Sequence, residues 1–226
     1  MKIAVHVYEC EDCDVLFAVS QSFEEQHLVQ CPICKSDKAL KGFVGLPSSG
    51  KTTAATNLNK ALVARNIKTA IIPEFARDYM RAKGDRIRTG EEQIRCSQIQ
   101  SDLESRALET NPEVMITDTP VFITQAYTQL YYPHHNLTEN HRLSNFHKYD
   151  TIFWCNGDTY QEDGVRFQTK QELQKLDGLL KNLIETYHRK PVITIPTERN
   201  KRINFLDSVA KELEYGIRYN SNIIIG

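Results

Sequence analysis

The sequence predicts an α/β fold: a parallel sheet of five strands with helices on both faces, preceded by a small cysteine-bearing module. Two observations carry this prediction. From residue 41 onward, short apolar runs alternate with longer segments of helical periodicity, which is typical of a parallel sheet with helical crossovers. Before that point, four of the six cysteines fall within the first 34 residues. We therefore divide the 226-residue chain into a module at 1–40 and a larger domain at 41–226.

The composition is that of an ordinary globular protein. Hydrophobic residues make up 40% and charged residues 25% of the chain, and the net charge is −1. This balance excludes a global basic field that would attract nucleic acid, and it argues against disorder. The most apolar run, Ile223-Ile224-Ile225, is far shorter than the roughly 20 residues that span a bilayer, and the N-terminus has no signal-peptide pattern. We expect a cytoplasmic protein without membrane contact.

The N-terminal cysteines have the spacing of a zinc ribbon. They form two Cys-x2-Cys pairs separated by seventeen residues: Cys10, Cys13, Cys31 and Cys34. Each pair can direct two thiolates at one tetrahedral Zn²⁺, and a metal would supply folding free energy that a segment of about 40 residues lacks. We predict a structural zinc ion here. The other two, Cys96 and Cys155, are expected to be small buried side chains.

A phosphate-binding loop follows the first predicted strand, 42–44. Residues 45–52 read G-x-x-x-x-G-K-T and lead into a predicted helix at 53–65. In such a loop, glycines let backbone N–H groups wrap phosphates at a helix N-terminus. Lys51 would reach the β- and γ-phosphates, and the Thr52 hydroxyl would bind Mg²⁺. We expect the following residues to bind ATP: Gly45, Ser48, Ser49, Gly50, Lys51, Thr52 and Thr53.

The remaining elements follow in order along the chain. Strands are predicted at 67–72, 114–116, 151–155 and 192–195, with helices at 75–83, after Thr89 and after Thr169. Both threonines have a glutamate three residues later, the spacing of a capping box. The tail, 217–226, has strand character. It could add an edge strand or pair with a second copy, so a homodimer is one expectation.

Two acidic residues come directly after predicted strands. Glu74 follows the second strand and Asp118 the third. Because the carboxyl ends of parallel strands meet at one edge of the sheet, both belong near the phosphates. Either could accept the proton of an attacking hydroxyl, and Asp118 could bind Mg²⁺ through water. The alternatives are a helix-terminal charge for Glu74 and a turn residue for Asp118.

Arginines are the expected partners of the transferred group and of its acceptor. Arg166 lies in a polar stretch, 156–168, that suits a lid closing over the γ-phosphate, although a solvated loop would have the same composition. Arg77 and Arg81 are four residues apart on one predicted helix. They could hold the acceptor or be solvated.

Together these segments resemble the ribosylnicotinamide kinase domain of bacterial NAD-regulator proteins, within a wider group of P-loop kinase domains. The matching segments are GLPSSGKTT (45–53), PEFARDY (73–79), ITDTPVFITQAY (116–127), YDTIFWCNGD (149–158), DGVR (163–166) and ERN (198–200). The resemblance implies five parallel strands, ATP–Mg²⁺ on the loop and a lid arginine at Arg166. It also implies an acceptor near Glu74, Asp118 and Tyr127, with Arg199 near the adenine. The sequence departs from that family in carrying the cysteine module and no adenylyltransferase domain.

Three functions remain open at this point. The first is a kinase acting on a free nucleoside such as ribosylnicotinamide. The second is the same chemistry on a nucleoside unit within DNA or RNA, for example a hydroxymethylated pyrimidine, with the ribbon holding the strand. The third is a binding module switched by ATP. Residues 1–38 have a net charge of −4, a poor footprint for phosphates, but zinc ribbons often accompany nucleic-acid enzymes. We predict phosphorylation of a hydroxyl, with a slight preference for the polymer.

Overall fold

The structure is a computed structural model, and it describes residues 5–9, 16–20, 39–135, 148–157, 168–188, 190 and 192–223. At the N-terminus, β1 (Val5–Glu9) and β2 (Leu16–Ser20) form an antiparallel pair, with Val7 opposite Ala18. Cys10, Cys13, Cys31 and Cys34 lie outside the described residues. The zinc ribbon and its metal therefore stay predictions.

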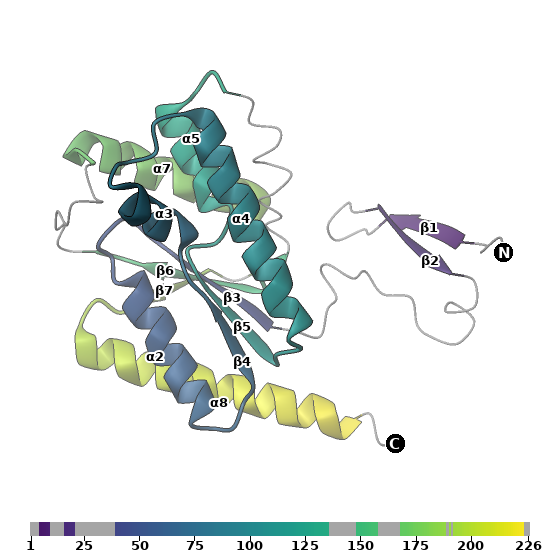
Figure 1. Cartoon of the computed structure of the whole chain (residues 1–226). Helices are drawn as coiled ribbons and strands as arrows, with labels where there is room; N and C mark the ends of the chain where they lie inside the picture. Colours follow the sequence, from purple (N-terminus) through teal and green to yellow (C-terminus); the bar gives the residue numbers. More distant parts are fainter. Residues whose placement is uncertain are drawn as a thin grey trace.

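A five-stranded parallel sheet forms the centre of the fold (Figure 1). Its strands are β3 (Ala39–Val44), β4 (Thr69–Ile72), β5 (Val114–Asp118), β6 (Thr151–Cys155) and β7 (Val192–Ile195), in the spatial order β4-β5-β3-β6-β7. The predicted α/β fold is confirmed. Because β3 lies between β5 and β6, the strand order reverses at its carboxyl end, which is where open α/β sheets bind ligands.

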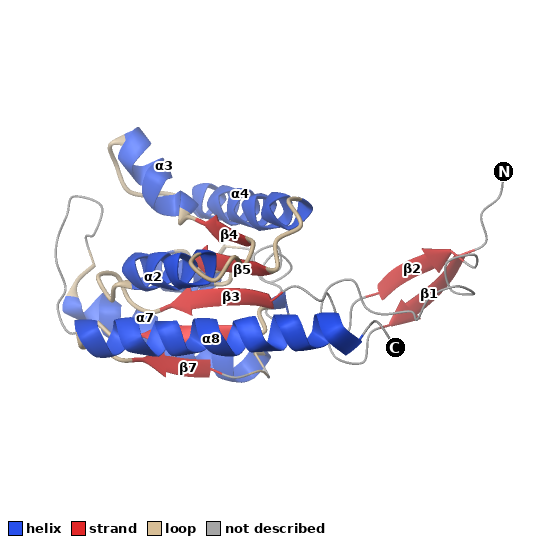
Figure 2. Ribbon diagram, turned by 90° about the horizontal axis from the view of Figure 1, so that it is seen from below, coloured by secondary structure: helices blue, strands red, loops and turns tan. Residues whose placement is uncertain are grey.

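Helices cover both faces of the sheet. On one face lie α2 (Lys51–Val63) and α8 (Arg199–Ile223), and on the other α4 (Gly90–Glu109), α5 (Ile123–Tyr131) and α7 (Lys170–Tyr187) (Figure 1). The short helix α3 (Phe75–Lys83) packs beside α4 and buries none of its residues. Figure 2 shows α3 projecting from the body of the domain at the edge marked by the strand arrowheads.

Alternation along the strands separates two hydrophobic clusters. In β6, Ile152 and Trp154 belong to the cluster under α5 and α7, whereas Phe153 and Cys155 belong to the cluster under α2 and α8. Both free cysteines in the described part of the chain are buried, since Cys96 is 2% and Cys155 1% exposed. Their prediction as small buried side chains is confirmed.

The two predicted capping boxes have different outcomes. Thr169 and Glu172 form the reciprocal pair at the start of α7. At the start of α4, the Thr89 hydroxyl accepts the N–H of Glu92 (3.1 Å), but the Glu92 carboxylate turns away. It accepts the N–H of Arg88 (2.7 Å) and pairs with Lys83 of α3. This second bond links α4 to α3 instead of closing the box.

The end of the chain corrects one expectation. Helix α8 continues to Ile223, so the strand expected at 217–226 is wrong for residues 217–223, and the last three residues lie outside the described part. Phe205, Val209 and Ile217 recur at helical spacing and pack against the cluster under α2. Burial of this stripe outweighs the strand preference of the terminal isoleucines. No helix in the described ranges is both long enough and apolar enough for a membrane crossing.

Strand boundaries also shift slightly. The second strand begins at Thr69 rather than at residue 67, because Ile67 lies in the turn after α2. Its side chain is buried in the cluster under α2, and its N–H donates to the Leu62 carbonyl oxygen. Ile67 thus packs at the end of α2. The sequence pattern alone assigned this apolar residue to the strand.

Candidate active site

The phosphate-binding loop connects β3 to α2 and has the backbone that its glycines permit. Gly45 has φ +152°, and a Cβ there would lie 2.2 Å from the carbonyl oxygen of Cys155. Ser48 and Gly50 also have positive φ, at 66° and 81°. The N–H of Ser49 donates to the Leu46 carbonyl oxygen (3.2 Å), which closes the turn. The loop therefore brings its backbone close to the start of α2, where backbone N–H groups can bind an anion.

Lys51, the first residue of α2, lies against this loop. Only 7% of the residue is exposed, and its Nζ donates to the carbonyl oxygens of Gly45 and Leu46, each at 3.0 Å. Burial lowers the pKa of the Lys51 ammonium below its usual 10.5, and the charges of Glu74 and Asp118 oppose this shift. A buried cation that has lost its hydration gains from a polyanionic ligand.

Four of the predicted site residues form a chain of contacts. The Thr52 hydroxyl donates to Oδ2 of Asp118 (2.5 Å). The same hydroxyl accepts from Nη1 of Arg77 (3.0 Å), whose Nη2 lies 2.6 Å from Oε2 of Glu74. The residues come from α2, the end of β5 and the β4–α3 junction, so the sheet edge gathers them as expected. Arg77 places a positive charge between the two carboxylates.

Thr52 and Asp118 have the chemistry of a magnesium site. Asp118 is 4% exposed, and its Oδ1 is buried with no hydrogen-bond partner among the described residues. A hydroxyl and a carboxylate in contact are the hard oxygen ligands that Mg²⁺ takes when it also binds phosphates. These two residues fit the ion, which would supply positive charge to the nucleotide phosphates.

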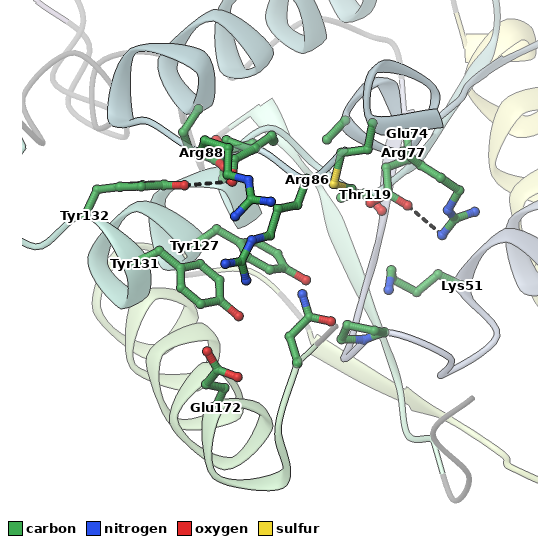
Figure 3. A pocket seen from close by; sticks show the side chains of 17 residues that line it. Lys51, Glu74, Arg77, Arg86, Arg88, Thr119, Tyr127, Tyr131, Tyr132 and Glu172 are labelled. Carbon is green, nitrogen blue, oxygen red and sulfur yellow. Dashed lines mark hydrogen bonds and ion pairs between the residues drawn. The ribbon is translucent and has the colours of Figure 1, made fainter. Parts of the chain in front are cut away.

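A cavity of about 460 Å³ adjoins Lys51 (Figure 3). Its walls come from the phosphate loop, α3, the loop after α3, α4, α5 and the start of α7. Figure 3 shows Lys51, Glu74 and Arg77 on one side and Tyr131 and Glu172 on the other. Small-molecule sites commonly measure 300–1,000 Å³, so the cavity has room for one such ligand.

The structure sorts the predicted acceptor residues. Arg77 and Tyr127 line the cavity together with Lys51 and Glu74. Arg81 does not: its side chain is 59% exposed, and it lies 3.9 Å from Asp78 of its own helix. The four-residue spacing placed both arginines on one helix, but only Arg77 reaches the phosphate loop.

Several lining residues were not among the site residues that the sequence predicted. They are Arg86, Arg88, Gln93, Thr119, Tyr131, Tyr132, Gln168 and Glu172. One signal was available: Tyr131 lies four residues after Tyr127, and the two rings are stacked with centroids 6.3 Å apart. Gln93 and Gln168, which are 4% and 7% exposed, come from α4 and from the segment before α7, and only the fold brings both to the cavity.

The described residues do not test the roles expected for the two arginines on the nucleotide side. Arg166 lies outside the described residues. Arg199 begins α8 and is exposed. It is Arg202, one turn later, that meets the phosphate loop: its Nε donates to the Pro196 carbonyl oxygen (2.8 Å), and its Nη1 would lie 2.4 Å from a Cβ at Gly50. The roles of Arg166 and Arg199 stay predictions.

Solved structures with the same fold include nucleotide-binding enzymes. The NadR protein in complex with NAD and AMP-PNP matches with a TM-score of 0.59 at 19% identity over 77% of this chain, but only 49% of its own chain. Deoxyadenosine kinase from M. mycoides (TM-score 0.55, 12% identity) matches over 76% of this chain and 99% of its own. Thymidylate kinase from Ehrlichia chaffeensis (TM-score 0.57, 16% identity) matches over 78% and 98%.

These similarities establish a P-loop kinase-like fold, and for the NadR protein the match spans about half of that chain. No curated protein matches the sequence. Residues 42–202, which include the phosphate loop, the second half of β3, the other four parallel strands and the cavity, match the protein family described as AAA domain. The chain therefore belongs to this AAA-domain family.

Proposed function

We propose that this protein transfers the γ-phosphoryl group of ATP to a hydroxyl group of a nucleoside-type acceptor. One observation carries the proposal: a cavity of ligand size begins at the lysine of the phosphate loop and has a carboxylate, Glu74, in its wall. A phosphoryl-transfer site needs these parts side by side, with nucleotide phosphates, acceptor and proton acceptor in reach of one another. The kinase names of two similar structures support phosphoryl transfer, and deoxyadenosine is a nucleoside acceptor.

The residues suggest how the reaction proceeds. The acceptor oxygen forms a bond to the γ-phosphorus while the bond from that phosphorus to the β-bridging oxygen breaks, and ADP leaves. The proton of the acceptor hydroxyl passes to a carboxylate. We favour Glu74 for this role because it lines the cavity, whereas Asp118 accepts a bond from Thr52. Lys51 and Arg77 balance negative charge around the phosphates.

We infer that the acceptor is a single free nucleoside. Tyr127 and Tyr131 offer stacked rings that suit a planar base. Two buried amides, Gln93 and Gln168, also line the cavity, and Oε1 of Gln168 has no hydrogen-bond partner within the described ranges. Such amides could bond the polar edge of a base. This cavity supports a free nucleoside over the polymer that the cysteine spacing slightly favoured.

The proposal is tested by offering γ-labelled ATP to several acceptors side by side. Ribosylnicotinamide, deoxynucleosides, plain DNA and hydroxymethylated DNA cover the competing acceptors. Label on a free nucleoside supports the proposal. Label on DNA alone would show instead that the acceptor is a nucleoside unit within DNA. Steady phosphate release without a labelled acceptor would favour a binding module switched by ATP. Asp78→Asn, an exposed change on α3, serves as the control that should leave transfer intact.

A further inference from the structure

Thr119, directly after Asp118, has a backbone conformation that threonine rarely adopts. Its φ is +80°, where β-branched residues are genuine outliers. It also precedes Pro120, whose ring further restricts the backbone before it. Within the described ranges, the other non-glycine residues with positive φ are Ser48 of the phosphate loop and two asparagines, a type that tolerates this region. Thr119 is therefore the least expected of them.

The surrounding packing holds this turn in place. Pro120 fits closely against β3, since a Cβ at Gly42 would lie 2.8 Å from its Cγ. The next N–H, of Val121, lies 3.2 Å from the Tyr149 hydroxyl oxygen and 3.3 Å from Oε1 of Glu104. Tyr149 in turn donates to the Glu104 carboxylate at 2.9 Å. Anchors on both sides allow an unfavourable φ to persist, as is common at functional sites.

The Thr119 side chain is buried and faces the cavity. The residue is 7% exposed and lines the cavity, and its Oγ1 has no hydrogen-bond partner in the described part of the chain. Figure 3 places it on the same side as Lys51 and Glu74. A buried hydroxyl without a partner destabilises the folded state unless a ligand supplies the bond. Glycine would relieve both costs, so stability does not account for threonine here.

We propose that Thr119 binds the acceptor. Its hydroxyl donates a hydrogen bond to the sugar oxygen that receives the phosphoryl group. This inference rests on the proposed function and adds a residue to it. A threonine hydroxyl can donate while the acceptor keeps its own proton for Glu74. The rigid turn after Asp118 fixes the position of this bond relative to the magnesium ligands.

Three variants separate the hydroxyl from the backbone. Thr119→Val keeps the branched shape and removes the hydroxyl, Thr119→Ser keeps the hydroxyl, and Thr119→Gly removes both hydroxyl and strain. We expect Thr119→Val and Thr119→Gly to lower kcat/KM for the nucleoside about tenfold, while Thr119→Ser stays close to wild type. The KM for ATP should not change. Thr119→Gly should also raise Tm, so stability and activity move in opposite directions.

A matched control tests whether strain relief alone alters activity. Asn111, in the exposed turn between α4 and β5, has φ 52° and is not part of the cavity. Asn111→Gly should leave kcat/KM unchanged. Wild-type kinetics in Thr119→Val, or a loss confined to the KM for ATP, would overturn the inference and leave the proposed function standing. A wild-type protein that labels no nucleoside would overturn both.

Discussion

Each face of the sheet has a hydrophobic cluster, but the helices that cover the two faces bury different proportions of polar residues. Under α2 and α8 the packing is apolar, with Phe43 and Phe153 stacked at 5.0 Å, and apart from Lys51 these helices bury no polar residue among their described side chains. On the opposite face, α4 and α5 bury many polar side chains: Gln93, Ser97, Gln100, Glu104, Thr124, Gln125 and Thr128. Buried polar groups cost free energy unless they are satisfied or used.

The difference assigns a separate task to each face. The apolar face fixes the phosphate loop, because α2 begins at Lys51 and packs along α8. The face under α4 and α5 shapes the cavity and holds the turn after Asp118 through Glu104, which is 3% exposed and also pairs with Lys148. Burial raises the pKa of Tyr149 well above its usual 10.0, so its hydroxyl remains a donor to Glu104. We therefore expect nucleotide binding to depend on one face and acceptor placement on the other.

The largest expected effect comes from the residue where the apolar face meets the nucleotide. Lys51→Ala removes the only described side-chain ammonium that lines the cavity, and transfer should fall by at least about 10³-fold. Circular dichroism should show an intact fold, because the packing of α2 does not depend on the ammonium. Retained transfer of labelled phosphate would mean that this loop is not the catalytic one.

The second effect distinguishes the two carboxylates. Glu74→Gln should lower kcat by about 10²- to 10⁴-fold with little change in ATP affinity. Asp118→Asn should instead weaken the binding of Mg²⁺ and so raise the Mg²⁺ concentration needed for half-maximal transfer, since this residue contacts Thr52. Single-turnover kinetics over a magnesium titration measures both. The opposite pattern, with Glu74→Gln altering the magnesium dependence, would exchange their roles.

The third effect compares the faces through stability. Glu104→Gln leaves Lys148 without its buried partner and should lower the free energy of unfolding by about 3 kcal/mol. Leu58→Ala opens a cavity under α2 and should lower it by about 2–5 kcal/mol. Urea unfolding measures both changes. Only Glu104→Gln should also raise the KM for the acceptor; an equal rise in Leu58→Ala would remove the division between the faces.

A smaller effect concerns pH. Because burial lowers the pKa of Lys51, its ammonium deprotonates in the folded protein below 10.5 while the unfolded chain still holds the proton. The unfolded state then binds more protons, so this residue makes the free energy of unfolding rise with pH between the two pKa values. In the same pH range kcat/KM for ATP should fall, because its pH dependence follows the ionisation of the free enzyme, in which Lys51 loses its proton. A profile that stays flat up to pH 10.5 would contradict the assignment.

The smallest expected effect comes from the predicted zinc. Neither hydrophobic cluster contains a described residue that precedes Leu40. Removal of the metal, or Cys10→Ser, should therefore eliminate bound zinc while transfer to a free nucleoside persists. Metal analysis and the labelled-ATP assay measure the two outcomes. Loss of nucleoside transfer together with zinc would show that the module serves the active site.

Local patterns predicted the surroundings of the phosphate loop better than the remaining walls of the cavity. The G-x-x-x-x-G-K-T loop and the carboxylates after β4 and β5 depend on adjacent residues, so the sequence revealed them. The bounds of α3 were also predicted, because Gly84 ends its pattern. Gln93 and Gln168 line the cavity only because α4 and the segment before α7 both reach it, and the positive φ of Thr119 has no signal in residue type. The terminal strand failed because packing on α2 outweighed local preference.

The contact between Gly42 and Pro120 has a consequence for comparing sequences. Gly42 lies in the central strand and does not need a positive φ, so on backbone grounds alone alanine would serve. Yet a methyl group there would collide with the proline ring. The two positions should therefore covary across relatives: where a side chain larger than hydrogen replaces Gly42, a smaller or displaced partner is expected at 120. In aligned sequences, such a covarying pair would indicate which relatives retain the same turn after Asp118.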